Sequence, residues 1–444
     1  MKRYLKTLLT VVILAGLWFG FNYYNKHKSA ASTATPEKPK ELLLPVKKDQ
    51  IQAFTITPRS GEAFTVKRDG GTWSITEPRP LPADQQEIST YVGDLASATV
   101  NSVADEHPAN LKDFGLDPPA TTVSVSTSAK PGQFTLRIGD STPTGDAIYA
   151  QVAGVPRVVT LSGNGKSPLD KSLFDLRDKR ALTIDSDQID RLDVTTNGKS
   201  YTLSKNPDGV WDLLLPPAVR ADNFSVSNLL SGFQGLPMVA ILQEDKQGDS
   251  KYGFGKPTLT VKVTSPSGSQ TIVVGKKDGN AYDSMNSALD PVFTLSADFV
   301  PRFQIDPATL RDKSFFSFSD FDAKHVELTT PKEHRVFEQS NFKWKATSPS
   351  SKDETTEKMN ALLDSLTNLK AVSFPKAAAG TLAPFGLNKP LYTFKVTFGE
   401  KNTVQIVDVG SVNDHYYAAR STDAVPGEIS KTALDALEKA LGAL

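Results

Sequence analysis

Alternation of apolar and polar residues is the clearest pattern in the chain after residue 45. Three short runs place apolar side chains two residues apart, and glycine-containing turns separate the runs. The three pairs are Phe54 and Ile56, Phe64 and Val66, and Trp73 and Ile75. A period of two residues predicts strands with one buried face, and turns this short predict antiparallel pairing. We therefore expect a three-stranded meander.

A helical period replaces the alternation after the proline-rich segment 78–82. Asp84 is a suitable helix N-cap, and the apolar residues after it are spaced i, i+3, i+4 and i+7. These residues are Ile88, Tyr91, Val92 and Leu95. A second group of alternating runs follows between residues 123 and 161. The meander, the helix and the second group of antiparallel strands together predict an α+β fold.

This order of elements occurs three times, and an aromatic-Gly-apolar stretch marks its middle. The stretch is Phe114-Gly115-Leu116, then Tyr252-Gly253-Phe254, then Phe385-Gly386-Leu387. Its glycines are 138 and 133 residues apart, and the tryptophans Trp73, Trp211 and Trp344 have the same two spacings. Ordered landmarks with one period indicate tandem repeats. We expect Gly115 to adopt a positive φ in a tight turn, with Phe114 and Leu116 in the core.

The period divides most of the chain into three repeats, 46–182, 183–315 and 316–444. Each is long enough to be a small domain with its own core. The sequence Leu-Arg-Asp-Lys closes the first two repeats and is absent from the third, so it occurs only where another repeat follows. We interpret its charged residues as groups that tie one repeat to the next. They are Arg177 and Asp178, and Arg311 and Asp312.

The N-terminal region has a different pattern. Lys2, Arg3 and Lys6 precede an apolar run from residue 8 to residue 24, which ends in aromatic residues. Its length is at the short end of what spans a bilayer, and aromatic residues gather at membrane interfaces. We expect residues 1–28 to be a cytoplasmic start and transmembrane anchor, and residues 29–45 to be a linker; a cleaved signal peptide is the alternative. The expected location is the bacterial inner (plasma) membrane, single-pass, with the N-terminus cytoplasmic and the bulk extracytoplasmic.

Composition argues against several classes of function. The chain has 50 basic and 50 acidic residues, so no overall basic field attracts nucleic acid. It has no cysteine, which excludes disulfides, thiolate metal sites and a cysteine nucleophile. Its 5 histidines lack metal-ligand spacing, and Gly165-Lys166-Ser167 lacks the first glycine of a phosphate-binding loop. We expect no catalytic residue, no metal and no cofactor.

One tyrosine follows the strand-ending glycine of each repeat, at Tyr149, Tyr282 and Tyr416. If these rings are exposed together, they form an aromatic surface that suits a glycan or a protein partner. The alternative is that each tyrosine lies half-buried on its own strand.

Together these landmarks resemble a bacterial family known as a domain of unknown function (DUF4340). They are the basic start and single anchor, the meander with its tryptophan, the aromatic-Gly-Leu-x-x-Pro stretch, the strand that ends in glycine, and the later tyrosine. The resemblance covers nearly all of the chain after the linker, although Phe254 and the added Gly255 depart from it. Members are often encoded beside ABC transporters of the gliding-motility type, which implies an accessory role. The family has no assigned catalytic residues.

Three functions stay open at this point. The first is a non-enzymatic, membrane-anchored extracytoplasmic repeat protein, which serves as an accessory or scaffold component of an ABC-type transport or envelope system. Its expected partners are the membrane and an envelope protein such as a transporter subunit. The second function is a module that binds a cell-wall polymer. The third is an enzyme with a site between repeats, which predicts a deep cleft lined with carboxylates.

Overall fold

The computed structural model describes Trp18, Tyr23 and residues 41–163, 167–196, 198–215, 217–245, 249–376, 380–423 and 425–444. Apart from those two aromatic residues, the predicted anchor, 1–28, lies outside the described residues, as does most of the predicted linker, 29–45. Within the described part of the chain, no helix is both long enough and apolar enough to cross a bilayer.

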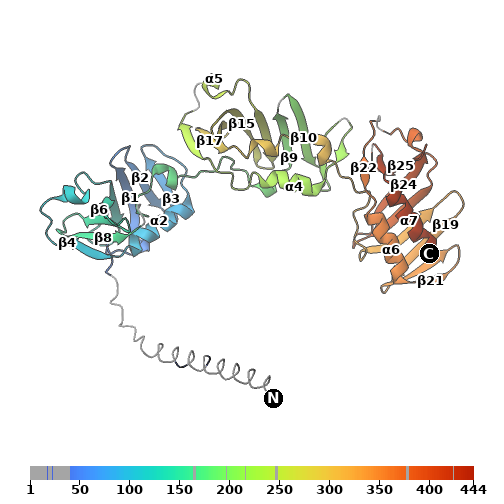
Figure 1. Ribbon diagram of the computed structural model, residues 1–444, viewed down its shortest axis with the longest axis horizontal. Coiled ribbons are helices and arrows are strands. Elements are labelled where there is room, and N and C mark those ends of the chain that lie inside the picture. Colours follow the sequence, from blue (N-terminus) through green and yellow to red (C-terminus); the bar gives the residue numbers. More distant parts are fainter. Residues whose placement is uncertain are drawn as a thin grey trace, which may run out of the picture. The chain divides into compact units, whose positions relative to one another are not determined.

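Three antiparallel sheets with few helices make up most of the described structure (Figure 1). They follow one another along the chain as the three predicted repeats do, which confirms the tandem β-rich architecture. The chain divides into two compact units. Residues 1–178 contain the first sheet, and residues 179–444 contain the second and third sheets.

The first sheet has eight strands in the order β3-β2-β1-β5-β6-β7-β8-β4. The meander and the second group of strands form one sheet because β1 pairs antiparallel with β5, which places Phe54 opposite Val125. The elements are β1 (Ile51–Pro58), β2 (Phe64–Asp69), β3 (Thr72–Glu77), α2 (Gln85–Ser97), β4 (Ser102–Asp105), η2 (Leu111–Phe114), β5 (Thr121–Thr127), β6 (Gln133–Ser141), β7 (Ala147–Val152), β8 (Val158–Ser162) and α3 (Leu173–Leu176).

The second sheet has the same order with one more edge strand, β12-β11-β10-β9-β14-β15-β16-β17-β13. Its first strand, β9, again pairs with the strand that follows the aromatic-Gly stretch, β14. The elements are β9 (Arg191–Thr196), β10 (Lys199–Lys205), β11 (Trp211–Leu213), β12 (Val219–Arg220), α4 (Asn223–Ser231), β13 (Ala240–Gln243), α5 (Asp249–Tyr252), β14 (Leu259–Ser265), β15 (Gly268–Asp278), β16 (Ala281–Asn286), β17 (Val292–Ser296) and η5 (Pro307–Leu310).

The third sheet repeats this plan in the order β21-β20-β19-β18-β23-β24-β25-β26-β22. A C-terminal helix, α7, is added to the helix that follows the meander. The elements are β18 (Ala323–Thr329), β19 (His334–Ser340), β20 (Lys343–Ser348), β21 (Lys352–Glu354), α6 (Thr356–Thr367), β22 (Ala371–Ser373), η6 (Ala383–Phe385), β23 (Tyr392–Phe398), β24 (Thr403–Val412), β25 (His415–Arg420), β26 (Gly427–Ile429) and α7 (Lys431–Ala443).

One face of each sheet is buried beneath helices. Alternate residues of β1 and β5 pack in one cluster with the apolar side of α2, and the second and third sheets pack in the same way against α4 and against α6 and α7 (Figure 1). The predicted N-cap is present, because the Asp84 carboxylate accepts hydrogen bonds from the amides of Gln86 and Glu87, both at 3.0 Å. This cap fixes where α2 begins over the sheet.

Candidate functional site

The aromatic-Gly stretch forms the same turn in every repeat. The φ angles of Gly115, Gly253 and Gly386 are 64°, 81° and 70°, so the predicted left-handed conformation is confirmed at the first position and recurs at the other two. Each turn lies against a glycine of the neighbouring strand. A Cβ atom at Gly139 would overlap the Phe114 carbonyl oxygen, and one at Gly410 would lie 2.6 Å from the Gly386 carbonyl oxygen. These glycines therefore serve a close approach of two backbones.

The turns pack on the face of the sheet opposite to the helices. Tyr252, Phe254 and Val292 form a small apolar cluster that is separate from the main core of the second repeat. Phe114 and Leu116 of the first repeat likewise lie outside its main core cluster, although Leu116 is buried. The prediction of buried positions is therefore confirmed for Leu116 and wrong for Phe114, which is half-buried, and neither residue joins the cluster beneath the helices. Local sequence shows that a residue is apolar, but it does not show which face of the sheet that residue covers.

The three repeated tyrosines, Tyr149, Tyr282 and Tyr416, are half-buried on strands β7, β16 and β25. The Tyr149 ring meets Phe114 edge-on, with ring centroids 5.1 Å apart, and the Tyr282 ring lies 5.8 Å from the Lys277 ammonium. Tyr416 packs against the core of the third repeat. In that repeat the ring that meets the aromatic-Gly turn belongs to Tyr417, which lies 5.0 Å from Phe385. Tyr417, which pairs with Gly410, is therefore the counterpart of Tyr149.

The repeated tryptophans lie on the third strand of each meander and belong to the cores. Trp73, Trp211 and Trp344 expose 9%, 7% and 2% of their surface. Cations flank two of the rings, since the Arg68 guanidinium lies 5.9 Å from Trp73 and the Lys205 ammonium lies 5.3 Å from Trp211. A ring buried to this extent offers little surface to a ligand.

The Leu-Arg-Asp-Lys segment runs antiparallel to the residues that precede the helix of its own repeat. Arg177 forms a bridge with Ala83, and Arg311 forms the equivalent bridge with Ala221. The Asp312 amide donates to the Arg220 carbonyl oxygen over 2.9 Å, and the Lys313 carbonyl oxygen then accepts from the Ala371 amide of the third repeat, at 2.8 Å. Around Arg311, the segment therefore hydrogen-bonds to the second repeat and then to the third.

Asp312 is the centre of the charged groups at this joint. The Arg220 Nε lies 3.4 Å from its Oδ2, and the Arg420 Nη2 lies 3.0 Å from the same oxygen. The Ser314 amide donates to its Oδ1 over 2.9 Å. Arg420 exposes only 7% of its side chain and also donates to the Phe315 carbonyl oxygen over 2.8 Å. A carboxylate shared by two guanidinium groups therefore ties strand β25 to the end of the second repeat.

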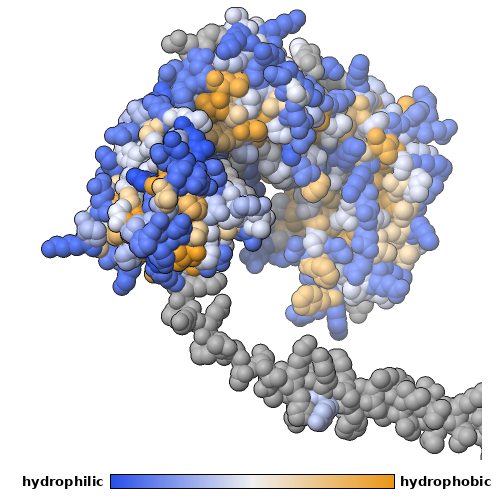
Figure 2. All heavy atoms as spheres, turned by 60° about the vertical axis from the view of Figure 1, so that its left-hand side comes forward, coloured by the Kyte–Doolittle hydropathy of each residue, from blue (hydrophilic) through white to orange (hydrophobic). Residues whose placement is uncertain are grey.

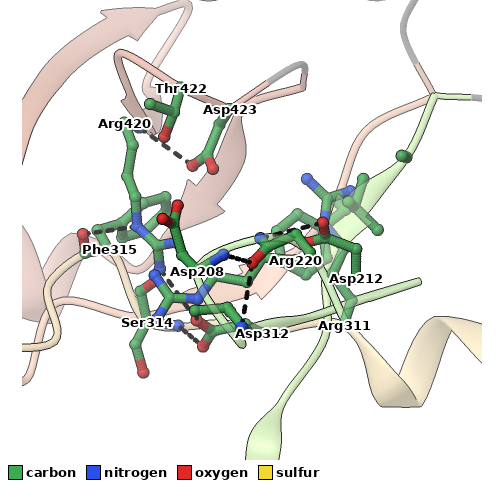
Figure 3. A pocket seen from close by; sticks show the side chains of 15 residues that line it. Asp208, Asp212, Arg220, Arg311, Asp312, Ser314, Phe315, Arg420, Thr422 and Asp423 are labelled. Carbon is green, nitrogen blue, oxygen red and sulfur yellow. Dashed lines mark hydrogen bonds and ion pairs between the residues drawn. The ribbon is translucent and has the colours of Figure 1, made fainter. Parts of the chain in front are cut away.

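These groups border a cavity of about 390 Å³ (Figure 3). Its walls come from the second repeat, the Leu-Arg-Asp-Lys segment and the third repeat, all within residues 179–444. The charged residues that line it are Asp208, Asp212, Arg220, Arg311, Asp312, Arg420 and Asp423. Phe315 and Phe374 supply its aromatic surface. It is our candidate functional site, because it combines concavity with a dense set of charged groups.

Two charges in the cavity are poorly compensated. Burial raises the pKa of Asp423 above its ordinary value, although Arg420 and Arg311 oppose this shift. Burial lowers the pKa of Arg311, whose guanidinium carbon lies 3.4 Å from the Phe374 ring centroid. Its Nη2 donates to the Val425 carbonyl oxygen over 2.9 Å. Each of these charges is less favourable here than in water.

The Leu-Arg-Asp-Lys pattern points to Arg311 and Asp312 but not to Arg420 and Asp423. Asn286 occupies the position of Arg420 in the second repeat, where its amide donates to the Ala181 carbonyl oxygen over 2.7 Å. Arg420 makes the corresponding bond to Phe315 and extends further, to Asp312. The second repeat has Asn at this position and the third has Arg. This difference between the repeats is the sequence signal that could have pointed to Arg420.

The sequence predicts neither a metal site nor a phosphate-binding loop. Among the described residues, no group of three or more potential metal ligands is arranged to hold an ion. Gly165 and Lys166 of the loop that resembles a phosphate-binding motif lie outside the described residues. Ser167 is buried, and its hydroxyl oxygen accepts a hydrogen bond from the Leu169 amide at 3.1 Å.

A family model described as Domain of unknown function (DUF4340) matches residues 73–247, 211–390 and 344–440. Each match begins at one of the repeated tryptophans, Trp73, Trp211 or Trp344. The second match runs from the meander of the second repeat to the aromatic-Gly turn of the third, and so includes the joint at Arg311 and Asp312. No curated protein matches the chain.

Proposed function

Because these matches extend from residue 73 to residue 440, the chain belongs to the DUF4340 family, and we propose that it is a non-enzymatic scaffold of the bacterial envelope. It is anchored in the inner membrane by residues 1–28, carries its repeats on the extracytoplasmic side, and is an accessory component of an ABC-type transport system. The basic start and the apolar run support the anchor. The face of each sheet that lies away from the helices, here called the open face, supports the scaffold role.

The central pair of this open face is neutral in the first repeat and charged in the other two, and this observation carries the proposal. The pair lies where the first strand of the meander meets the strand after the aromatic-Gly turn. It is Thr55 and Ser124 in the first repeat, Asp193 and Lys262 in the second, and Glu327 and Lys395 in the third. One backbone plan thus presents a neutral pair and two charged pairs. A scaffold that holds different parts of an assembly requires surfaces that differ in this way.

The charged pairs are accessible to a partner. Lys262 is exposed, and Lys395 keeps 40% of its side chain exposed while its ammonium lies 2.7 Å from Glu327. Figure 2 shows a mainly hydrophilic surface on which apolar side chains form small, separate groups. Exposed apolar patches are a common mark of binding sites. Because the central pairs of the second and third open faces are charged and accessible, we assign recognition to polar and charged side chains.

The cavity between the second and third repeats is lined with carboxylates, as the enzyme alternative predicts, but its central carboxylate, Asp312, is not free to act as a base. Its carboxylates lie among three arginines, and Asp312 is fully engaged by Arg220, Arg420 and the Ser314 amide. A general base must be near a proton that it can accept and must be free to accept it. The polymer-binding alternative has no specific support either, because Tyr149, Tyr282 and Tyr416 pack against groups of their own repeats.

Affinity purification of the full chain from detergent-solubilised membranes tests the scaffold proposal. We expect an ABC-transporter subunit to co-purify with the wild-type chain, and its recovery to fall at least about tenfold in the double variant Lys262→Glu, Lys395→Glu. Lys439→Glu on helix α7 is the matched control, because it reverses an exposed charge on the helical side of the third repeat. Absence of any envelope partner from the wild-type sample would contradict the proposal. Equal recovery of the transporter subunit with the wild type and all variants would show that the open face is not the docking surface.

A further inference from the structure

The cavity at the joint between the second and third repeats contains hydrogen-bonding capacity that the protein does not use. A guanidinium group has five N–H donors. Within the described residues, Arg311 uses one of them, to the Val425 carbonyl oxygen, and packs its flat face on Phe374. The Arg220 guanidinium faces Asp312, with Nε 3.4 Å from Oδ2, and among the described residues this Nε has no hydrogen-bond partner. The remaining donors of both arginines are available to a ligand in this cavity.

Acceptors are left over in the same cavity. One oxygen of the Asp423 carboxylate accepts from the Arg420 amide over 3.1 Å, and this is the only hydrogen bond to that carboxylate among the described residues. Asp208 also lines the cavity, and its side chain is exposed. Burial raises the pKa of Asp423. A cation beside this carboxylate would therefore compensate a charge that the fold leaves partly uncompensated.

A ligand with a single charge satisfies only half of this arrangement. A simple anion would bind the free arginine donors but would lie near Asp208 and Asp423, and a simple cation would meet three arginines. A zwitterion meets both requirements. The cavity volume of about 390 Å³ is within the range of small-molecule sites, roughly 300–1,000 Å³.

We propose that this cavity binds a small zwitterion of the amino-acid or short-peptide class, with its carboxylate on Arg311 and Arg220 and its ammonium on Asp423. The flat surface of Phe374 orients Arg311 for a two-point contact with the carboxylate. The ligand touches both the second and the third repeat, so its binding stabilises residues 179–444 as one unit. This proposal goes beyond the scaffold role and holds whether or not a partner docks on the open faces.

Calorimetric titration of the full chain in detergent tests the proposal with three probes. The probes are L-alanyl-L-alanine, its N-acetyl derivative, which lacks the ammonium, and its C-terminal amide, which lacks the carboxylate. We expect the unmodified dipeptide to bind at least about tenfold more tightly than either derivative. Inorganic phosphate is the fourth probe. If phosphate or the N-acetyl derivative binds as tightly as the dipeptide, the cavity is an anion site and the assignment of a zwitterionic ligand is overturned. If the dipeptide does not bind, the proposal as a whole is overturned.

Two variants distinguish ligand contact from structural damage. In Asp423→Asn the dipeptide and its N-acetyl derivative should bind equally, because the partner of the ammonium is gone. In Arg311→Lys the preference for the dipeptide over its amide should narrow but not vanish, because a lysine ammonium cannot form the two-point contact while Arg220 still faces the carboxylate. Arg177→Lys, at the same position of the first repeat, is the matched control and should leave all affinities unchanged. Uniform weakening of all the probes by either cavity variant would indicate a structural role and overturn the assignment.

Discussion

At the scale of single residues, the aromatic-Gly turn and the strand beneath it leave no room for a side chain on either side of their contact. Gly115 adopts a φ of 64°, where a side chain is strained, and Gly139 lies directly under the Phe114 carbonyl oxygen. The positive φ was predictable from a glycine between apolar residues before a proline-containing step. The partner glycine was not, because the contact joins positions that are far apart in the chain.

Gly139→Ala should therefore destabilise the first repeat by about 1–3 kcal/mol, the usual cost of forcing extra atoms into a packed site. The added Cβ overlaps a backbone oxygen, which cannot move without shifting the turn. Hydrogen exchange of peptides from β6 and β7, followed by mass spectrometry, measures the loss. Gly71→Ala is the matched control, because a Cβ there meets nothing within 4 Å. Equal effects of the two substitutions would contradict the close contact.

The pH dependence of stability should change in Asp423→Asn. Burial raises the folded-state pKa of Asp423 above the ordinary 3.8, so the folded state binds this proton more tightly than the unfolded state does. The associated stability is present at low pH and is lost as the pH rises from about 4 through the folded-state pKa. The variant should lose less stability over this rise and should be more stable than the wild type at neutral pH. Thermal melts of the full chain between pH 3.5 and 7 test this, and parallel curves for the two proteins would contradict it.

At the scale of elements, the meander and its helix follow from local pattern, whereas the union of two strand groups into one sheet does not. Apolar residues at Phe54 and Ile56 predict a strand with a buried face, and Asp84 predicts the helix start. The pairing of β1 with β5 depends on contacts between residues about 70 apart, such as Phe54 and Val125, and the pattern of either strand alone does not fix its partner.

The helix caps offer a test at this scale, because each repeat has one at the same place. Asp84, Asp222 and Thr355 each accept hydrogen bonds from the first turn of α2, α4 and α6. Asp84→Ala should cost the first repeat about 1 kcal/mol. Protection from hydrogen exchange should fall in α2 and in the strands beneath it, and it should stay unchanged in α6. Thr90→Ala, on the exposed side of α2, is the control. A loss of protection in α6 as large as that in α2 would contradict the claim that each repeat has its own core.

At the scale of the whole molecule, the second and third repeats form one compact unit, and Arg420 of the third repeat pairs with Asp312 at their junction. The Leu-Arg-Asp-Lys motif indicated a joint because it occurs only before another repeat, and the structure places Arg311 and Asp312 at the junction between the second and third repeats. The basic partner came from strand β25, more than one hundred residues later, which no local pattern reveals.

Arg420→Asn installs the residue that the second repeat has at this position. It should leave Asp312, whose side chain is 13% exposed, with a single cation, at a cost of about 3–5 kcal/mol, as for other broken buried pairs. In the wild type the protection of β9–β17 and β18–β26 should fall together as urea is added, and in the variant the two sets should separate. Arg335→Asn, which removes a more exposed ion pair with Glu333, is the control. Coincident transitions in Arg420→Asn would contradict the proposed joint.

The central claim is that the open sheet faces hold an envelope partner, and photo-crosslinking in intact cells tests it most directly. A photoreactive residue replaces Ser124, Lys262 or Lys395 on the open faces, and Thr90, Asn228 or Asn360 on the helices serves as the matched control. Mass spectrometry then identifies what each position contacts. We predict crosslinks to an ABC-transporter subunit from at least one open-face position and from none of the helix positions. Crosslinks to wall polymer alone, or none from the open faces, would contradict the scaffold account.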